Sequence, residues 1–202
     1  MTFGKMMAAG FLAASLAAIG SASPLLPGQT TSLFAGTLPG TDTLLTTVSG
    51  TFSNSLENGS YSTKVYKNSA TGFLDFVYSF AINSSSIDSM KKITLSSYAG
   101  FTTDVYYINN ADVAPTSADR SNAGTTAVTF YFGQNGVAPG KTADTAVIST
   151  NATNYTAGLM GFQDGYSFTV DSLAPCPTPE PMTYSLLGVG LAAMGLLKRK
   201  LV

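Results

Sequence analysis

The chain has 202 residues, of which 45% are hydrophobic and only 10% are charged, well below the roughly 25% charge of an average soluble protein. The 10 Lys and Arg residues stand against 11 Asp and Glu residues, so no basic field remains to hold a nucleic acid backbone. There is no His and a single Cys, which excludes an intramolecular disulfide and the usual imidazole or thiolate metal sites; we expect no cofactor.

The first 22 residues are typical of a secretory signal peptide. Lys5 supplies the positive start, residues 6–19 form a short apolar run, and small residues follow up to Ala22. We expect signal peptidase to cut after Ala22. An uncleaved anchor helix is the alternative, which the shortness of the apolar run disfavours.

Residues 23–174 predict an all-β domain, an antiparallel β-sandwich. In the segment 73–82, Leu74, Phe76, Tyr78, Phe80 and Ile82 recur at period two, which indicates a strand with one apolar face. Shorter strands are expected at 44–52, 61–66, 92–97, 103–108, 127–132, 145–149 and 166–170. A polar loop is expected at 112–126, and a turn at Pro139 and Gly140.

The C-terminal end combines a proline-rich spacer with an apolar segment. Residues 175–181 cannot form a helix or a central strand, because Pro lacks the amide donor. Residues 182–197 carry no charge and would rise about 24 Å as a helix, a marginal membrane span. A helix of the domain core is the weaker alternative, since apolar side chains surround its whole circumference. The cations that follow predict a stop on the cytoplasmic side, at Lys198, Arg199 and Lys200.

The tail as a whole resembles the PEP-CTERM sorting tail. The resemblance rests on the tripeptide Pro179, Glu180 and Pro181, the apolar span after it, the basic end and the N-terminal signal. It implies an exported bacterial protein that is briefly membrane-anchored, is cut by an exosortase-type membrane protease, and is then released or transferred to surface polysaccharide. The same tail is also known as the ice-binding protein C-terminal domain, a label that carries no information about residues 23–174.

The middle of the chain is similar, more loosely, to small exoproteins that carry such tails. The similarity lies in residues 74–78, 138–142, 150–153 and 164–165. It implies a sandwich outside the cytoplasm and no particular activity.

The sequence contains few groups suited to catalysis. General acid–base chemistry needs His or tuned carboxylates in a cleft, and the acidic residues of interest are scattered singly: Glu57, Asp75, Asp104, Asp112 and Asp164. We therefore expect no enzyme, with glycoside hydrolysis the least favoured alternative. The sequence has no dense acidic loop, so it predicts no dedicated calcium site. Cys176 is interpreted as an incidental spacer residue rather than a lipidation site or an intermolecular bridge.

These patterns favour a non-catalytic protein of the cell surface or extracellular matrix. The alternative is a carbohydrate-binding module of the exopolysaccharide matrix, with aromatic platforms drawn from Tyr61, Tyr106, Tyr107, Tyr131 and Tyr155. Against it stand the absence of Trp and the ordinary packing of tyrosines with their hydroxyls outward. Ice binding is a third hypothesis, disfavoured because the threonines follow no fixed repeat.

Overall fold

The computed structural model describes residues 22–38, 40–122 and 127–177, and within them it contains β-strands and no α-helix. Residues 1–21 of the expected signal peptide, the sorting tripeptide, the apolar span and the basic end all lie outside the described residues. Within the described ranges, no helix is long and apolar enough to cross a membrane.

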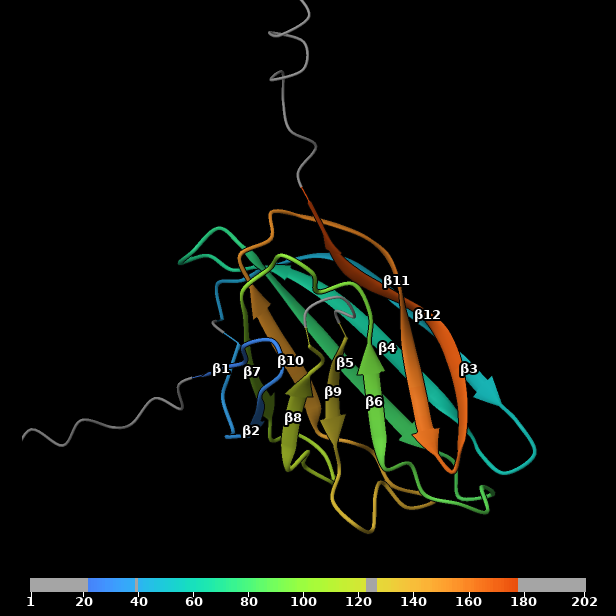
Figure 1. The fold of residues 1–202 in the computed structure, drawn as a ribbon. Helices are drawn as coiled ribbons and strands as arrows, with labels where there is room; N and C mark the ends of the chain where they lie inside the picture. Colours follow the sequence, from blue (N-terminus) through green and yellow to red (C-terminus); the bar gives the residue numbers. More distant parts are fainter. Residues whose placement is uncertain (1–21, 39, 123–126, 178–202) are drawn as a thin grey trace, which may run out of the picture.

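Twelve strands follow one another along the described part of the chain (Figure 1). They are β1 (Ser23–Pro24), β2 (Thr30–Ser32), β3 (Thr43–Ser53), β4 (Asn58–Lys67), β5 (Leu74–Ile82), β6 (Lys92–Leu95), β7 (Thr103–Ile108), β8 (Ser117–Arg120), β9 (Val128–Tyr131), β10 (Thr145–Thr150), β11 (Asn154–Asp164) and β12 (Tyr166–Cys176). All eight strands expected from the sequence are among them, with ends displaced by a few residues.

The strands form two six-stranded antiparallel sheets that pack face to face as a sandwich (Figure 1). Sheet A has the order β1-β7-β10-β5-β4-β3, and sheet B has the order β12-β11-β6-β9-β8-β2. The hairpins β3–β4, β4–β5 and β11–β12 are sequential neighbours. β10 instead lies between β5 and β7, which precede it by more than thirty residues.

The core is filled by the apolar faces of both sheets. The alternation in β5 places Phe76, Tyr78 and Phe80 inside, each at most 3% exposed. Phe162 of sheet B meets Phe80 of sheet A edge to face, with ring centroids 5.3 Å apart, and meets Phe52 at 4.8 Å. These ring contacts join the two sheets.

A second layer covers part of the outer face of sheet A. Val77, Tyr106 and Val147 are buried there, with Leu38 packed against them. The segment before β3 passes close to this face, because the amide of Gly36 donates to the carbonyl of Tyr107 at 2.7 Å. A Cβ atom at Gly36 would lie 2.6 Å from the Tyr106 ring, so only glycine permits this approach.

The sequence-based expectation was wrong at three places. The predicted loop 112–126 contains β8, whose short polar sequence carries little strand signal. β11 was missed, because its glycines weaken the alternation of apolar and polar residues. β12 runs on to Cys176, so the first two residues of the predicted spacer pair with β11. Pro175 is tolerated there because β12 is an edge strand.

One buried cation ties the N-terminal strands to the rest. Arg120 of β8 is 5% exposed and donates to the carbonyls of Leu25, Tyr98 and Phe101 at 3.3, 2.6 and 2.9 Å. Its guanidinium also donates to the hydroxyl of Thr103 at 3.0 Å. The planar guanidinium group of Arg can donate to several acceptors at once. Within the described residues, the buried charge of Arg120 is therefore stabilised by hydrogen bonds to these carbonyl and hydroxyl oxygens rather than by a carboxylate.

Candidate functional site

The acidic residues singled out in the sequence do not form one cluster. Glu57 closes the turn between β3 and β4: its amide donates to the Asn54 side chain at 2.7 Å and its carboxylate accepts from that side chain at 3.0 Å. Asp164, at the end of β11, forms an ion pair with Lys91 at 2.7 Å. Each of these carboxylates has a structural partner.

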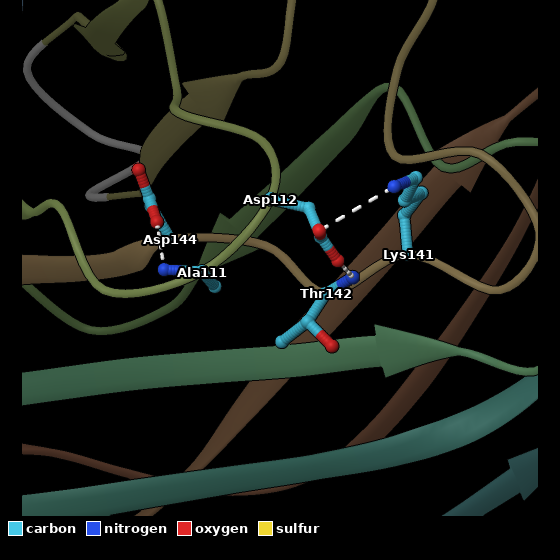
Figure 2. Close-up of polar contacts among 5 residues, drawn as sticks. All are labelled: Ala111, Asp112, Lys141, Thr142 and Asp144. Atoms are coloured by element: carbon cyan, nitrogen blue, oxygen red, sulfur yellow. Dashed lines mark hydrogen bonds and ion pairs between the residues drawn. The ribbon is translucent and has the colours of Figure 1, made fainter.

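Two further aspartates bind the loop after β7 to the segment that leads into β10. Figure 2 shows Asp112 accepting from the amide of Thr142 at 3.0 Å and from the Lys141 ammonium at 3.4 Å. Asp144 accepts from the amides of Asn110, at 3.0 Å, and of Ala111. Asp144 is 2% exposed, whereas the Asp112 side chain is 43% exposed. The pair acts as a loop clamp, and the sequence pointed to Asp112 without indicating Asp144.

Asp75 and Asp104 share the outer face of sheet A, on either side of Ser149 in the strand register. Burial raises the pKa of Asp75, although hydrogen bonds from Asn68 and Ser149 oppose the shift. The charge of Asp42, which the sequence did not single out, raises this pKa further. Burial also raises the pKa of Asp104. Because Asp75 is 2% exposed, a substrate cannot reach it in this conformation.

The outer face of sheet B is different, because it presents an ordered array of polar side chains. Strand register aligns one cross-strand row as Ser167, Gln163, Lys92, Tyr131, Ser117 and Ser32. The adjacent row is Thr169, Gly161, Thr94, Thr129, Asp119 and Thr30. We call these two rows the polar face of sheet B.

Two shallow hollows lie along this face and meet at Gln163. One, of about 420 Å³, is lined by Lys92, Tyr131, Gln163 and Asp164 among others. The other, of about 390 Å³, lies over Gly161, where the missing side chain lowers the surface. Hollows of this depth suit a ligand that lies along a surface rather than one that is enclosed.

The polar groups around Tyr131 are held in place by one another. Lys92 lies over its ring, 5.7 Å from the centroid, and its hydroxyl donates to the Asp119 carboxylate. This hydrogen bond, with burial, raises the pKa of Tyr131 to about 12. The hydroxyls of Thr94 and Thr129 lie 3.2 Å apart. The arrangement offers a partly exposed ring, an ammonium, an amide and hydroxyls, which is chemistry for hydrogen-bonding a hydroxyl-rich ligand.

The tyrosines proposed as a binding platform are largely used in packing. Tyr106 is 7% exposed, and Tyr61 and Tyr107 are half-buried against the core. Tyr155 is 40% exposed but pairs with Pro175, at the opposite end of β11 from Gln163. Of the five, only Tyr131 contributes to the polar face of sheet B. The alternation of polar and apolar residues in β6 could have identified Lys92 as a residue of the outer face. Gln163 could not have been identified in this way, because the sequence did not predict β11.

The residues tied to export lie mostly outside the described chain. Ala22, the expected last residue of the signal, is half-buried, and β1 begins at Ser23 and pairs with β7. Cleavage after Ala22 would leave β1 whole. Pro179, Glu180, Pro181, Lys198, Arg199 and Lys200 are not described.

Among the described residues, no three His, Cys, Asp or Glu side chains lie close enough together to hold a metal ion. The chain matches no protein-family model, no curated protein and no solved structure.

Proposed function

We propose that this protein is exported and serves as a non-catalytic component of the cell surface or extracellular matrix. The observation that carries the proposal is the use of its acidic side chains. The carboxylates of Asp112, Asp144 and Glu57 hold loops in place through hydrogen bonds. Asp164 forms an ion pair with Lys91, and Asp75 is buried and accepts a hydrogen bond from Asn68. Groups that hold the fold together are poorly suited to acid–base work, which needs an accessible proton.

The two ends of the chain support the route. The signal peptide is removed after Ala22, and residues 182–197 hold the protein briefly in the membrane. An exosortase-type protease then reads Pro179, Glu180 and Pro181 and removes the tail.

Intact mass of the protein from culture supernatant tests this route, using a tag placed within residues 23–174. We expect loss of residues 1–22 and of the tail from near Pro181 onward. Replacing the tripeptide by alanines should leave the protein in the membrane fraction, while Thr178→Ala, just outside the tripeptide, should be secreted normally. Secreted material that retains residues 198–202, or a pool that stays in the cytoplasm, would contradict the proposal.

A second candidate function is polysaccharide binding on the polar face of sheet B. The favouring observation is the alignment of Tyr131, Lys92 and Gln163 in one row beside two shallow hollows. Amide and hydroxyl groups hydrogen-bond sugar hydroxyls, and a partly exposed ring stacks on the apolar face of a sugar.

Affinity electrophoresis of the secreted protein in gels containing bacterial exopolysaccharide tests this binding. The variant Gln163→Ala should lose most of the retardation, because Gln163 borders both hollows. The matched control Ser49→Ala, exposed on sheet A, should migrate as the unmodified protein does. Equal migration with and without polysaccharide would contradict polysaccharide binding, but it would not contradict the proposal of an exported surface or matrix component.

A further inference from the structure

The sandwich has four edge strands, and three of them carry features that discourage pairing with another chain. β1 has two residues, one of them Pro24, and β2 has three residues. β12 is long but contains Asp171 and Pro175. Short length, charge and proline are the devices by which soluble proteins protect the open edges of their sheets.

The fourth edge strand, β3, has none of these three features, and its one irregularity is a bulge near one end. Its sequence TLLTTVSGTFS runs for 11 residues without a charge or a proline. The register shifts between Leu44 and Thr46, and the strand is then regular from Thr46 to Ser53. Within the described chain, β4 is the only strand that pairs with β3, so one row of its backbone donors and acceptors is open. Figure 1 shows β3 (cyan) at the far side of sheet A from β1.

We propose that β3 is a self-association surface, on which β3 of a second copy pairs antiparallel to extend sheet A across a two-fold axis. The order of sheet A would then read continuously through β3 into the partner's β3. An isologous contact of this kind uses the same strand from both copies and therefore closes at a dimer. Main-chain hydrogen bonds would supply the attraction, as in other strand additions.

The side chains of β3 raise no electrostatic barrier to pairing with a second copy of the same strand. Because the strand is uncharged, no alignment places like charges opposite one another. Thr47, Ser49 and Thr51 are small, exposed and on one face, so they allow a neighbouring strand to approach. The β-branched residues Thr46, Thr47 and Val48 favour extended pairing. The net charge of the chain, −1, adds almost no repulsion between copies.

The tail of the same chain is the competing occupant of this edge. Residues 175–181 contain four prolines, which cannot supply a continuous row of amide donors. The uncharged residues after them have the composition of a membrane helix rather than of a strand. A second copy is therefore the better match for the open edge.

Light scattering coupled to size-exclusion chromatography of the full chain in detergent tests the proposal, because it gives the mass of the protein part alone. The full chain should form a concentration-dependent dimer. Ser49 lies near the centre of the regular stretch, so Ser49→Lys would place two cations close together at the two-fold axis. We expect the dissociation constant to rise by at least about tenfold. Ser49→Glu should behave alike, and mixing the two variants should restore a dimer.

Thr169→Lys is the matched control, since it places the same charge on an exposed position of the β12 edge. It should leave the dimer unchanged, and circular dichroism should show all variants folded. A full chain that stays monomeric at every concentration would overturn the proposal. So would a dimer that survives both Ser49 variants, a dimer lost in Thr169→Lys instead, or a dimer that disappears only on removal of residues 178–202.

Discussion

The carboxyl group of Asp75 lies almost wholly out of solvent, on the outer face of a sheet whose inner face is also buried. Its oxygen accepts from the Asn68 amide at 3.0 Å, and Ser149 supplies a second hydrogen bond. Desolvation nevertheless outweighs these bonds and raises the pKa of Asp75. The folded protein therefore binds the Asp75 proton more tightly than the unfolded chain does.

The variant Asp75→Asn should become more stable relative to the unmodified protein as pH rises. A raised folded pKa means that Asp75 helps the fold while protonated, and that this contribution is lost as pH rises through the folded pKa. Asn cannot ionise and can still accept from Asn68. Urea unfolding from about pH 3.5 to about pH 7 should show the difference in unfolding free energy growing in favour of the variant.

The variant Asp112→Asn provides a control of opposite sign. The amide of Thr142 holds the pKa of Asp112 below its ordinary value, so the ionised form stabilises the fold above that value and the contribution is lost in acid. The Asn variant should therefore lose stability relative to the unmodified protein as pH rises. If the stability of both variants, relative to the unmodified protein, changed with pH in the same direction, then burial of Asp75 and the Thr142 hydrogen bond to Asp112 would not explain the two pKa shifts.

At the level of elements, the loop clamp shows how two similar aspartates differ in importance. Asp144 is buried and accepts from the consecutive backbone amides of Asn110 and Ala111, whereas Asp112 is exposed. Figure 2 shows the bond from Ala111. The buried carboxylate of Asp144 makes its hydrogen bonds away from competing water, whereas the exposed carboxylate of Asp112 competes with water for its partners. The loop after β7 is thus held chiefly by Asp144.

Asp144→Ala should lower the free energy of unfolding by about 2 kcal/mol, because two amides would lose their acceptor. Hydrogen exchange should speed up at the amides of Asn110 and Ala111. Asp112→Ala, the exposed member of the clamp, should change stability little. If both variants cost the same, burial would not be what separates them.

The predictability of each element followed from its local pattern. β5 was predicted to within one residue because large apolar side chains recur on one face, from Leu74 to Ile82. β8 was missed because Ser117–Arg120 has the composition of a loop and is a strand only through pairing with β2 and β9. The structural role of Asp144 was equally hidden, since it depends on where a loop some thirty residues earlier comes to lie.

At the scale of the whole molecule, tilted and edge-on contacts between phenylalanine rings hold the two sheets together. Phe162 of β11 is fully buried and contacts Phe52 and Phe80 of sheet A and Phe168 of sheet B. The hydroxyls of Thr63 and Ser172, 3.0 Å apart, add a buried bond between the sheets. Because one core serves both sheets, we expect them to unfold together.

Phe162→Ala should lower the free energy of unfolding by about 3 to 5 kcal/mol, the cost of a large cavity in an aromatic core. Tyrosine fluorescence and far-ultraviolet circular dichroism should report the same urea midpoint, as for one cooperative unit. Tyr166→Ala, on the same hairpin but 65% exposed, should change stability by less than about 0.5 kcal/mol. Separate transitions for the two signals would show that the sheets unfold independently.

The sequence by itself determined the all-β class, eight of the strands and the expectation of two antiparallel layers, because those properties depend on period-two alternation within short segments. It also predicted the export and sorting signals, which depend on local composition and lie mostly outside the described residues. Only the tertiary structure decided that β10 lies between β5 and β7, that Lys92, Tyr131 and Gln163 share one row, and that β3 is an open edge. These are relations between segments far apart in the chain, set by how two sheets bury one common core, and no local pattern encodes them.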